Sequence, residues 1–212
     1  MGKVSSPEMV NLVIFMFSPY LDYWFKEITP LLEESFGKID YISKELDFGR
    51  YTTYYDKELG PGSKGKLIGF ERLIHPSLIA DVKLKTNQLE MAFAVEGKRK
   101  FNLDPGYIHH MNFILASTKS WTNRIYVGKG VYAEITLMYL NGSFRHWEFT
   151  YPNYANDEYK RELEHIRNLY LEKRRLSLEG VNISENRNKG IGLSKERSRL
   201  RRFEGDSGAE IT

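Results

Sequence analysis

The chain has 212 residues, of which 41% are hydrophobic and 14% aromatic, so it can bury a core and is not globally disordered. Its net charge of +3 comes from the C-terminal end, because residues 173–212 carry ten Lys and Arg against six Asp and Glu. The preceding residues carry 21 basic and 22 acidic side chains, and this balance excludes a nucleic-acid surface spread over the folded part. The sequence contains no cysteine, which excludes disulfides, thiolate catalysis and cysteine-bound zinc and is consistent with a cytoplasmic protein.

The N-terminal part of the chain predicts a helix flanked by strands. Residues 10–17 form an apolar run of strand length, which is far too short to cross a membrane. A helix should follow over residues 21–36, because apolar side chains recur there at helical spacing and Gly37 is a suitable C-terminal cap. Pro30 should kink or open this helix. Further strands are predicted at residues 38–46 and 66–74.

The remaining residues predict a second helix, a β-hairpin and a long C-terminal helix. His75 and Pro76 open the second helix, and Asn141–Gly142 between two strand-like runs predicts a tight turn. Residues 157–175 should form an amphipathic helix whose apolar face comprises Tyr159, Leu163, Ile166 and Tyr170. Between these elements, the sequence predicts a strand at residues 98–103, a turn at 104–107 and a short helix at 108–117.

This order of elements predicts an α+β fold in a single domain, residues 1–175. Strand–helix–strand–strand–helix–strand is the order of a ferredoxin-like βαββαβ sandwich, here extended by a β-hairpin and a C-terminal helix. A three-layer α/β sheet is the alternative. Residues 176–212 are polar, contain glycine and serine and include one aromatic residue, so we expect a disordered basic tail.

Residues 60–67, GPGSKGKL, match the G-x-x-x-x-G-K part of a phosphate-binding loop. Such a loop joins a buried strand to a helix and ends in Ser or Thr, whose hydroxyl binds magnesium. Here Leu67 replaces the hydroxyl, a polar segment precedes the glycines and a strand-like segment follows them. The sequence also contains neither D-x-x-G nor N-K-x-D, the companion motifs of a GTPase. We therefore interpret residues 60–67 as a glycine-rich turn between strands.

Five segments of the chain resemble a known family. They are LLEESFGKIDYIS (31–43), NLDPGY (102–107), LASTK (115–119), RIYVGKGVYAEITL (124–137) and TYPNY (150–154). In this order and spacing they are similar to the prokaryotic domain-of-unknown-function family numbered 4416, over about residues 10–172. Proteins of this family are often named GTP-binding proteins, so the resemblance implies GTP as a ligand to consider but implies no established activity.

The segments contain three groups of candidate ligand-binding residues. At the end of strand 98–103, polar side chains can point into a cleft, although Asp104 can also simply bond its own turn. The second group, in residues 117–124, combines hydroxyls with two cations, which suits binding of a phosphate or carboxylate. The alternative is that these residues form only a capped, solvated loop without a ligand. The third group shares one strand face, where a buried Glu134 would need Arg124 or Lys119 as its partner. This ion pair could be purely structural or could be part of a ligand site. The groups are Asn102, Asp104 and Tyr107; Ser117, Thr118, Lys119 and Arg124; and Glu134 and Thr136.

No metal site is predicted from the histidines. The five histidines lack H-x-H and H-x-x-x-H spacings, and the adjacent His109 and His110 would diverge on the helix expected at residues 108–117. These two histidines are also not typical of the family that the chain resembles. We therefore assign no catalytic role to them.

Three functional hypotheses follow. The leading one is a cytoplasmic protein that binds a small anionic molecule, a nucleotide such as GTP being one option, without a Walker-type loop. The second is an enzyme that uses Asp104 or Glu134 as a general base, with or without a divalent metal. The third is an interaction module whose basic tail docks an acidic partner or nucleic acid. No cofactor is identified, and no membrane association is expected.

Overall fold

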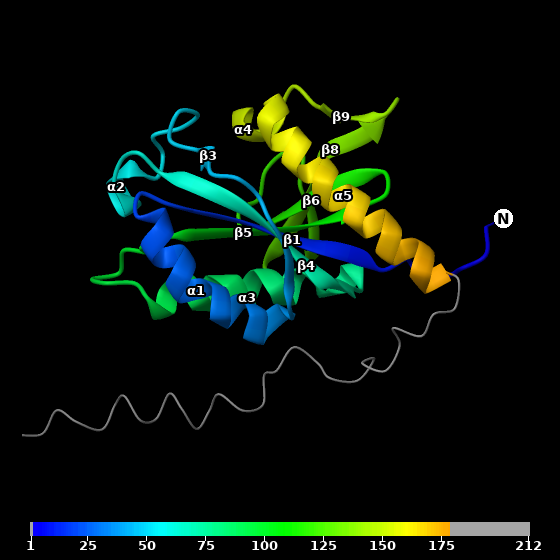
Figure 1. Ribbon diagram of the computed structural model, residues 1–212, viewed down its shortest axis with the longest axis horizontal. Coiled ribbons are helices and arrows are strands. Elements are labelled where there is room, and N and C mark those ends of the chain that lie inside the picture. Colours follow the sequence, from blue (N-terminus) through cyan, green and yellow to red (C-terminus); the bar gives the residue numbers. More distant parts are fainter. Residues whose placement is uncertain (1, 179–212) are drawn as a thin grey trace, which may run out of the picture.

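The computed structural model describes residues 2–178, which form one nine-stranded antiparallel sheet with helices on both faces (Figure 1). The strands are β1 (Val10–Ser18), β2 (Ile39–Ile42), β3 (Leu46–Asp47), β4 (Lys64–Ile74), β5 (Asn102–His109), β6 (Asn112–Ser117), β7 (Ile125–Gly128), β8 (Val131–Leu140) and β9 (Ser143–His146). The helices are α1 (Leu21–Phe36), α2 (Asp56–Leu59), the 3-10 helix η1 (Pro76–Leu78), α3 (Ile79–Ala92), α4 (Pro152–Ala155) and α5 (Asp157–Leu178).

One half of the sheet has the strand order of a ferredoxin-like fold. The order is β2-β4-β1-β5-β6-β8-β7, with β3 beside β4 and β9 beside β8. If β1, β2, β4 and β5 are numbered 1 to 4 as the strands of a βαββαβ unit, they lie in the order 2-3-1-4 and pair antiparallel, with α1 and α3 as the two helices. The α+β class is therefore confirmed, and β6 to β9 extend the sheet beyond β5.

Alternate residues of the central strand β1 face two separate cores. Leu12 and Ile14 pack under α1 and α3, whereas Val13 and Phe15 pack under α5. This alternation is the pleat of a strand that is buried on both faces. Because α5 covers the second face, the molecule has three layers (Figure 1). The antiparallel sheet is nevertheless that of an α+β fold and not of the α/β alternative.

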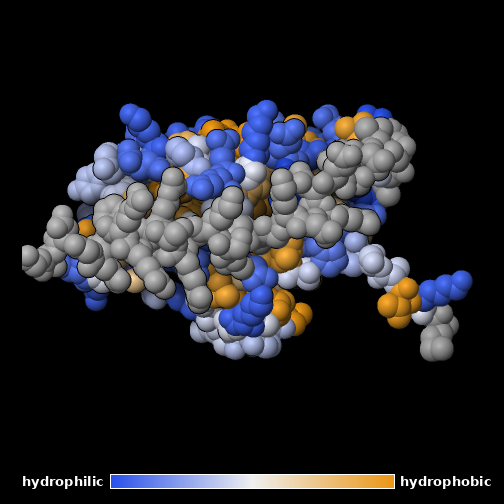
Figure 2. Space-filling view, turned by 90° about the horizontal axis from the view of Figure 1, so that it is seen from below, coloured by the Kyte–Doolittle hydropathy of each residue, from blue (hydrophilic) through white to orange (hydrophobic). Residues whose placement is uncertain are grey.

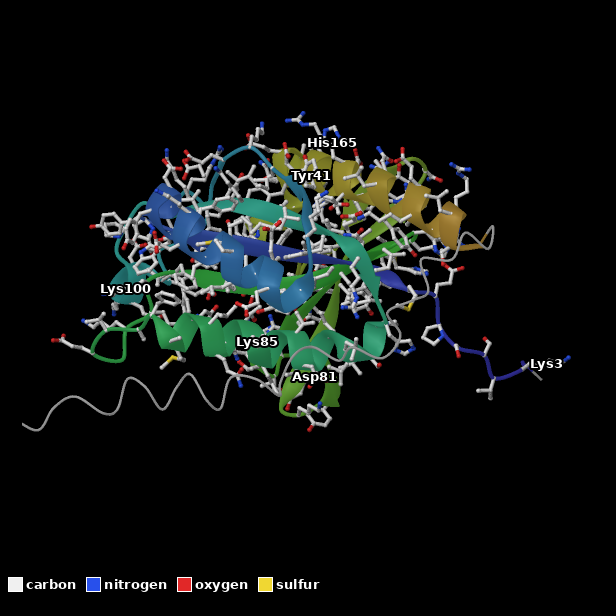
Figure 3. The ribbon with its side chains drawn as sticks, turned by 60° about the horizontal axis from the view of Figure 1, so that its bottom comes forward. Lys3, Tyr41, Asp81, Lys85, Lys100 and His165 are labelled. Carbon is white, nitrogen blue, oxygen red and sulfur yellow. The ribbon has the colours of Figure 1, made fainter. Side chains whose placement is uncertain are left out.

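The two long amphipathic helices bury the faces that their periodicity predicts. Helix α1 continues across Pro30 as one helix and ends at Gly37, whose φ of 96° suits a glycine. On α5, the apolar side chains named above are fully buried. Helix α5 also contacts β2, because Tyr41 of β2 donates a 2.6 Å hydrogen bond to Glu162 and stacks on His165 (Figure 3). Helix α5 extends three residues past the expected domain end, and residues 179–212 of the expected tail lie outside the described residues.

Two predictions in the middle of the chain are wrong. Residues 104–107, expected to form a turn, belong to β5, and residues 108–117, expected to form a helix, are the end of β5, a turn and β6. Pro105 lies where one side of the strand is unpaired, because β5 pairs with β6 only from Gly106 onwards, whereas its pairing with β1 continues through Pro105 and Ile14. At Gly106, a Cβ would overlap the carbonyl oxygen of Ile114, so the close approach of the two strands requires glycine.

The glycine-rich segment is not a phosphate-binding loop. Gly60 ends α2 with a φ of 99°, and β4 begins at Lys64, so Gly65 and Lys66 lie inside a strand and not before a helix. A Cβ at position 65 would overlap the ring of Phe15, so the glycine lets β4 run close to β1. The segment is a turn that leads into a strand, as interpreted from the sequence, but it follows the short helix α2 and not a strand.

The turn between β8 and β9 has the predicted geometry. Asn141 and Gly142 have φ values of 52° and 81°, and the flanking residues Leu140 and Ser143 pair across the hairpin. Positive φ at both central residues is the geometry that Asn-Gly favours. The hairpin therefore follows directly from its two turn residues.

The surface combines polar residues with apolar ones. The face below α1 and α3 shows hydrophobic residues beside hydrophilic ones (Figure 2). Trp121, Ile125 and Tyr126, at and before the edge strand β7, are exposed. Within residues 2–178, no helix has the length and apolar character needed to cross a membrane.

Candidate functional site

A cavity of about 550 Å³ lies where β5 and β6 stop pairing. The ladder ends at Gly106, so Asn102 and Asp104 on one strand and Ser117 on the other line the cavity without pairing to each other. Helix α3 forms the wall on one face of the sheet, and the segments 48–55 and 151–154 form the wall on the other. This volume is typical of small-molecule sites.

Buried charges of α3 form one end of the cavity. Glu90, which is 3% exposed, accepts hydrogen bonds from the Leu103 amide (2.6 Å) and from Arg99 (3.0 Å). Burial raises the pKa of the Glu90 carboxyl group, although Lys83 acts in the opposite direction. The Lys83 ammonium donates to the Leu103 carbonyl (3.1 Å) and lies 3.7 Å from the Asp104 carboxylate. Opposite charges therefore compensate one another at this end.

Arg99 holds this end together. It donates two parallel hydrogen bonds to Glu58 (2.6 and 2.7 Å) and one to the side-chain oxygen of Asn102 (2.6 Å). With its bond to Glu90, four of its five N–H groups are used. The hydrogen bond from Arg99 lowers the pKa of Glu58. Arg99 therefore positions the wall and has little capacity left for a ligand.

Arg124 has the same role at the opposite end. Its Nε donates to Glu134 at 2.7 Å, and both side chains are almost completely buried. Its two other nitrogens donate to the Ser117 hydroxyl (3.0 Å), the Lys119 carbonyl (2.9 Å) and the Tyr151 hydroxyl (3.1 Å). Arg124 is therefore the partner that a buried Glu134 was expected to need. It also fixes the loop that follows β6.

Lys119 is the cation at this end that can still receive an anion. Its ammonium donates to the Tyr54 hydroxyl at 2.9 Å and lies 4.3 Å from the centroid of that ring. Within the part of the chain that the structure describes, no ion pair joins Lys119 to a carboxylate. The hydrogen bond from Lys119 lowers the pKa of Tyr54. Two of the three ammonium hydrogens thus remain for a ligand beside the hydroxyls of Ser117 and Thr118.

Aromatic side chains supply the flat walls of the cavity. Tyr54 and Tyr55 lie edge to face at 4.9 Å between centroids. Burial raises the pKa values of Tyr55 and Tyr154, so both carry neutral hydroxyls at physiological pH. Rings of this kind can stack on a planar group of a ligand. The aromatic lining residues are Phe48, Tyr51, Tyr54, Tyr55, Tyr151 and Tyr154.

Two buried amides of the cavity wall have an unpaired donor. The oxygen of Asn102 accepts from Arg99, but its Nδ2 has no acceptor among the described residues. The Nδ2 of Asn153, a residue that is 4% exposed, is in the same situation, as are the hydroxyls of Tyr51 and Tyr154. An unpaired buried polar group costs about 1–3 kcal/mol. Because these atoms are fully covered, the side chains would have to turn towards the cavity before oxygen atoms of a bound ligand could satisfy them.

The candidate residues named from the sequence fall into two sets. Tyr107 lies outside the cavity because residues 104 and 107 face opposite sides of the strand that replaces the expected turn. Tyr107 and Glu134 line a second, apolar hollow, and Thr136 is buried with its hydroxyl 3.2 Å from Glu134. The residues that do line the cavity together are Asn102, Asp104, Ser117, Thr118, Lys119 and Arg124.

Several lining residues were not singled out from the sequence. Lys83, Asn87 and Glu90 occur at positions i, i+4 and i+7, which places them on one face of α3. This polar stripe beside the apolar one was the signal that could have identified them. Arg99 and Tyr54 have no comparable pattern, because the fold alone brings their segments to the cavity.

The arrangement suits recognition of a polar organic anion. Donors outnumber free acceptors, because Glu90 and Glu134 are each bonded to an arginine. Asp104 is the carboxylate with the most freedom, since its side chain is 32% exposed and its nearest cation, Lys83, is 3.7 Å away. It can accept a hydrogen bond or a proton from a bound molecule.

Comparison with known proteins identifies the family but no named relative. No curated protein and no solved structure matches the chain. The family model described as a domain of unknown function, DUF4416, matches residues 8–170, which include every described residue that lines the cavity. The resemblance that the five sequence segments carry is therefore confirmed, and the chain belongs to the DUF4416 family.

Proposed function

We propose that this protein binds a small anionic molecule with a planar ring, of the nucleotide class, in the cavity between the ends of β5 and β6. The observation that carries the proposal is that Lys119 lines the same aromatic-lined cavity as Asn102 and Asn153, whose Nδ2 atoms are buried and have no acceptor among the described residues. Buried donors and an available cation favour a ligand rich in oxygen and negative charge. A nucleotide such as GTP combines these groups with a flat base, and the cysteine-free sequence is consistent with a cytoplasmic site of action.

The proposed pose follows from the charges. The anionic group would lie against the Lys119 ammonium and the hydroxyls of Ser117 and Thr118, at the end that Arg124 fixes. The planar group would stack among the tyrosines. Oxygen atoms between the two would accept hydrogen bonds from the buried amides. No part of this pose uses the glycine-rich segment at residues 60–67.

A thermal-shift panel tests the proposal directly. The full-length protein is melted with GTP, GDP, ATP and inorganic phosphate, each with and without magnesium. A ligand at a hundredfold over its Kd should raise the melting temperature by about 5–10 °C. A shift with nucleotides supports the proposal. If no nucleotide or phosphate raises the melting temperature, the proposal is wrong.

A general base in the same cavity is the second candidate function, and the partial exposure of Asp104 favours it. Glu134 is a poorer base because it is buried against Arg124. If the protein turns over a bound nucleotide, Asp104→Asn should abolish product formation and leave binding within about a factor of three. Chromatography of the nucleotide after incubation measures the product. Equal turnover in the wild type and in Asp104→Asn would show that Asp104 is not the general base. The hypothesis that the basic tail docks a partner concerns residues outside the described part of the chain.

A further inference from the structure

Two histidines and a carboxylate meet at the far end of β5 from the cavity lining. His109 is the last residue of β5, His110 follows it in the turn, and Glu8 belongs to the segment that precedes β1. The two imidazole rings lie 3.9 Å apart between centroids. The sequence suggested that they diverge on a helix, but the strand end and the turn bring them together.

We propose that Glu8, His109 and His110 bind a divalent transition-metal ion, with zinc(II) as the preferred ion. The Glu8 oxygen Oε2 lies 3.6 Å from His109 Nε2 and 3.5 Å from His110 Nδ1. One ligand atom from each residue lies within 4.8 Å of the other two. Two ligands of a tetrahedral zinc ion, at about 2.0–2.1 Å from the metal, are about 3.3 Å apart. The two distances to Glu8 are therefore within tenths of an ångström of the separation that a shared zinc ion requires, and the histidine ligand atoms lie within 4.8 Å of each other.

The ligand set also suits this metal chemically. Imidazole nitrogen and carboxylate oxygen are ligands that zinc takes in proteins, with water able to complete the coordination. The Nδ1 atom of His110 is buried and has no hydrogen-bond partner within residues 2–178, so a metal would satisfy its lone pair. The site needs no cysteine, in accord with a chain that contains none.

Helix α5 holds the ligand segments in place. Arg167 donates to the His110 carbonyl at 2.9 Å, and the Tyr170 hydroxyl donates to the Met9 carbonyl at 3.1 Å. Arg174 donates two hydrogen bonds of 2.7 Å to the Glu8 carboxylate. These three residues occupy one face of α5 at positions i, i+3 and i+7.

The arginine on Glu8 is compatible with a metal on the same carboxylate. Each carboxylate oxygen offers two lone pairs, so Oε2 can accept a hydrogen bond from Arg174 and still bind an ion. Hydrogen bonds to a ligating carboxylate orient it and are common around metal ions. Together, the contacts from α5 fix the Glu8 carboxylate and the backbone beside the other two ligands before any ion binds.

The test uses the full-length protein without a polyhistidine tag. Zinc(II) binding is measured by calorimetry, and cobalt(II) is added separately as a spectroscopic probe of the ligand set. We expect one ion per chain, a visible cobalt(II) absorption band, and a rise of several degrees in melting temperature with zinc(II) that a chelator reverses. His109→Ala and His110→Ala should each weaken zinc binding by about 100-fold or more. Glu8→Gln, which keeps the size of the side chain, should weaken it similarly.

Matched controls make the result specific. His146→Ala and His165→Ala remove exposed histidines outside the cluster, and both should leave the zinc affinity and the cobalt(II) band unchanged. Melting each variant without metal shows whether it is folded. If either histidine variant is unfolded, the zinc affinity of Glu8→Gln tests the proposed site instead. The proposal is overturned if the wild type binds no zinc or if the ligand variants bind it as tightly as the wild type does. Equal loss in a control variant would also overturn it.

Discussion

At the scale of single residues, two arginines shape the cavity and one lysine keeps donors available for the proposed ligand. Arg99 and Arg124 each spend four N–H groups on the protein, one around Glu58 and Glu90 and the other around Glu134 and its loop. Guanidinium groups suit this work because several donors project from one plane. Lys119 keeps free donors because its observed partner is a neutral hydroxyl.

Removing Arg124 should destabilise the fold. Arg124→Ala leaves Glu134 buried without its partner, so we expect a loss of about 3–5 kcal/mol in the free energy of unfolding. Urea unfolding measures it. The double variant Arg124→Met/Glu134→Leu replaces both charges with apolar side chains and should recover most of the loss. A loss below about 1 kcal/mol in Arg124→Ala would show that the pair is not buried as described.

The pair of Arg99 and Glu58 should make stability depend on pH. Because the pKa of Glu58 is lowered in the folded protein, its contribution is complete above its ordinary value of 4.5 and is lost as the pH falls through the lowered value. We therefore expect Glu58→Gln to be less stable than the wild type at neutral pH, with a difference that shrinks in acid. The pKa of Glu90 shifts in the opposite direction, but Glu90 is present in the wild type and in the variant, so its contribution cancels in the difference between their stabilities. Urea unfolding from neutral pH to below that range tests this, and a difference that does not change with pH would contradict it.

At the scale of elements, the cavity exists because two neighbouring strands stop pairing. β5 and β6 are held close at Gly106 and share no further pairs towards Asn102 and Ser117. Pro105 lies at the point where the ladder ends. The sequence feature that looked like a turn therefore ends a ladder, and this leaves space for a ligand between the strand ends.

Adding a methyl group at the close approach should disturb this junction. In Gly106→Ala the Cβ would overlap the backbone of Ile114, so we expect a loss of about 1–3 kcal/mol in the free energy of unfolding. Gly2→Ala is the matched control, because a Cβ at position 2 would meet nothing within 4 Å. Urea unfolding of both variants measures the difference. Equal stability of the two variants would mean that the strands are not in this close contact.

The sequence predicts those elements whose signals are local. The apolar spacing in α5 and the Asn141–Gly142 turn give the correct helix and hairpin, because each depends on neighbouring residues only. Residues 108–117 give the wrong element, since a short apolar run fits a strand or a helix and only pairing with β8 decides. The position of Pro105 within a strand likewise depends on where a distant strand stops.

The candidate site is predictable to a similar extent. Ser117, Lys119 and Arg124 lie near one another in the chain, and the fold places them together with Asp104 in one cavity. Arg99 comes from a segment that carries no motif, and the histidine cluster depends on contact between β5 and the N-terminal segment. Such contacts between distant segments arise from tertiary packing, which spacing in one sequence does not encode.

At the scale of the whole molecule, the three layers separate two tasks. α3 and the segments around α2 and α4 enclose the cavity, while α5 covers the second face of the sheet and fixes the N-terminal segment. The family match covers both parts. Among residues 2–178, the cavity lining lies between residues 48 and 154.

Deleting residues 179–212 should therefore leave ligand binding unchanged. Every lining residue in the described part of the chain lies outside the deleted segment, so we expect nucleotide affinity within about a factor of two of the full-length value. Calorimetric titration of both proteins measures it. Loss of nucleotide binding on deletion would move the site to the tail and favour the hypothesis of a docking module.

The central claim, that an anionic ligand binds in the cavity through Lys119, is tested most directly by calorimetric titration of GTP into the wild type and two lysine variants. Lys119→Ala removes the available cation, and Lys26→Ala removes an exposed lysine of α1 as the control. We predict saturable binding at one site in the wild type and in Lys26→Ala, and an affinity lower by about tenfold or more, about 1.4 kcal/mol, in Lys119→Ala. Absence of binding in the wild type, or equal affinities in all three proteins, would contradict the claim.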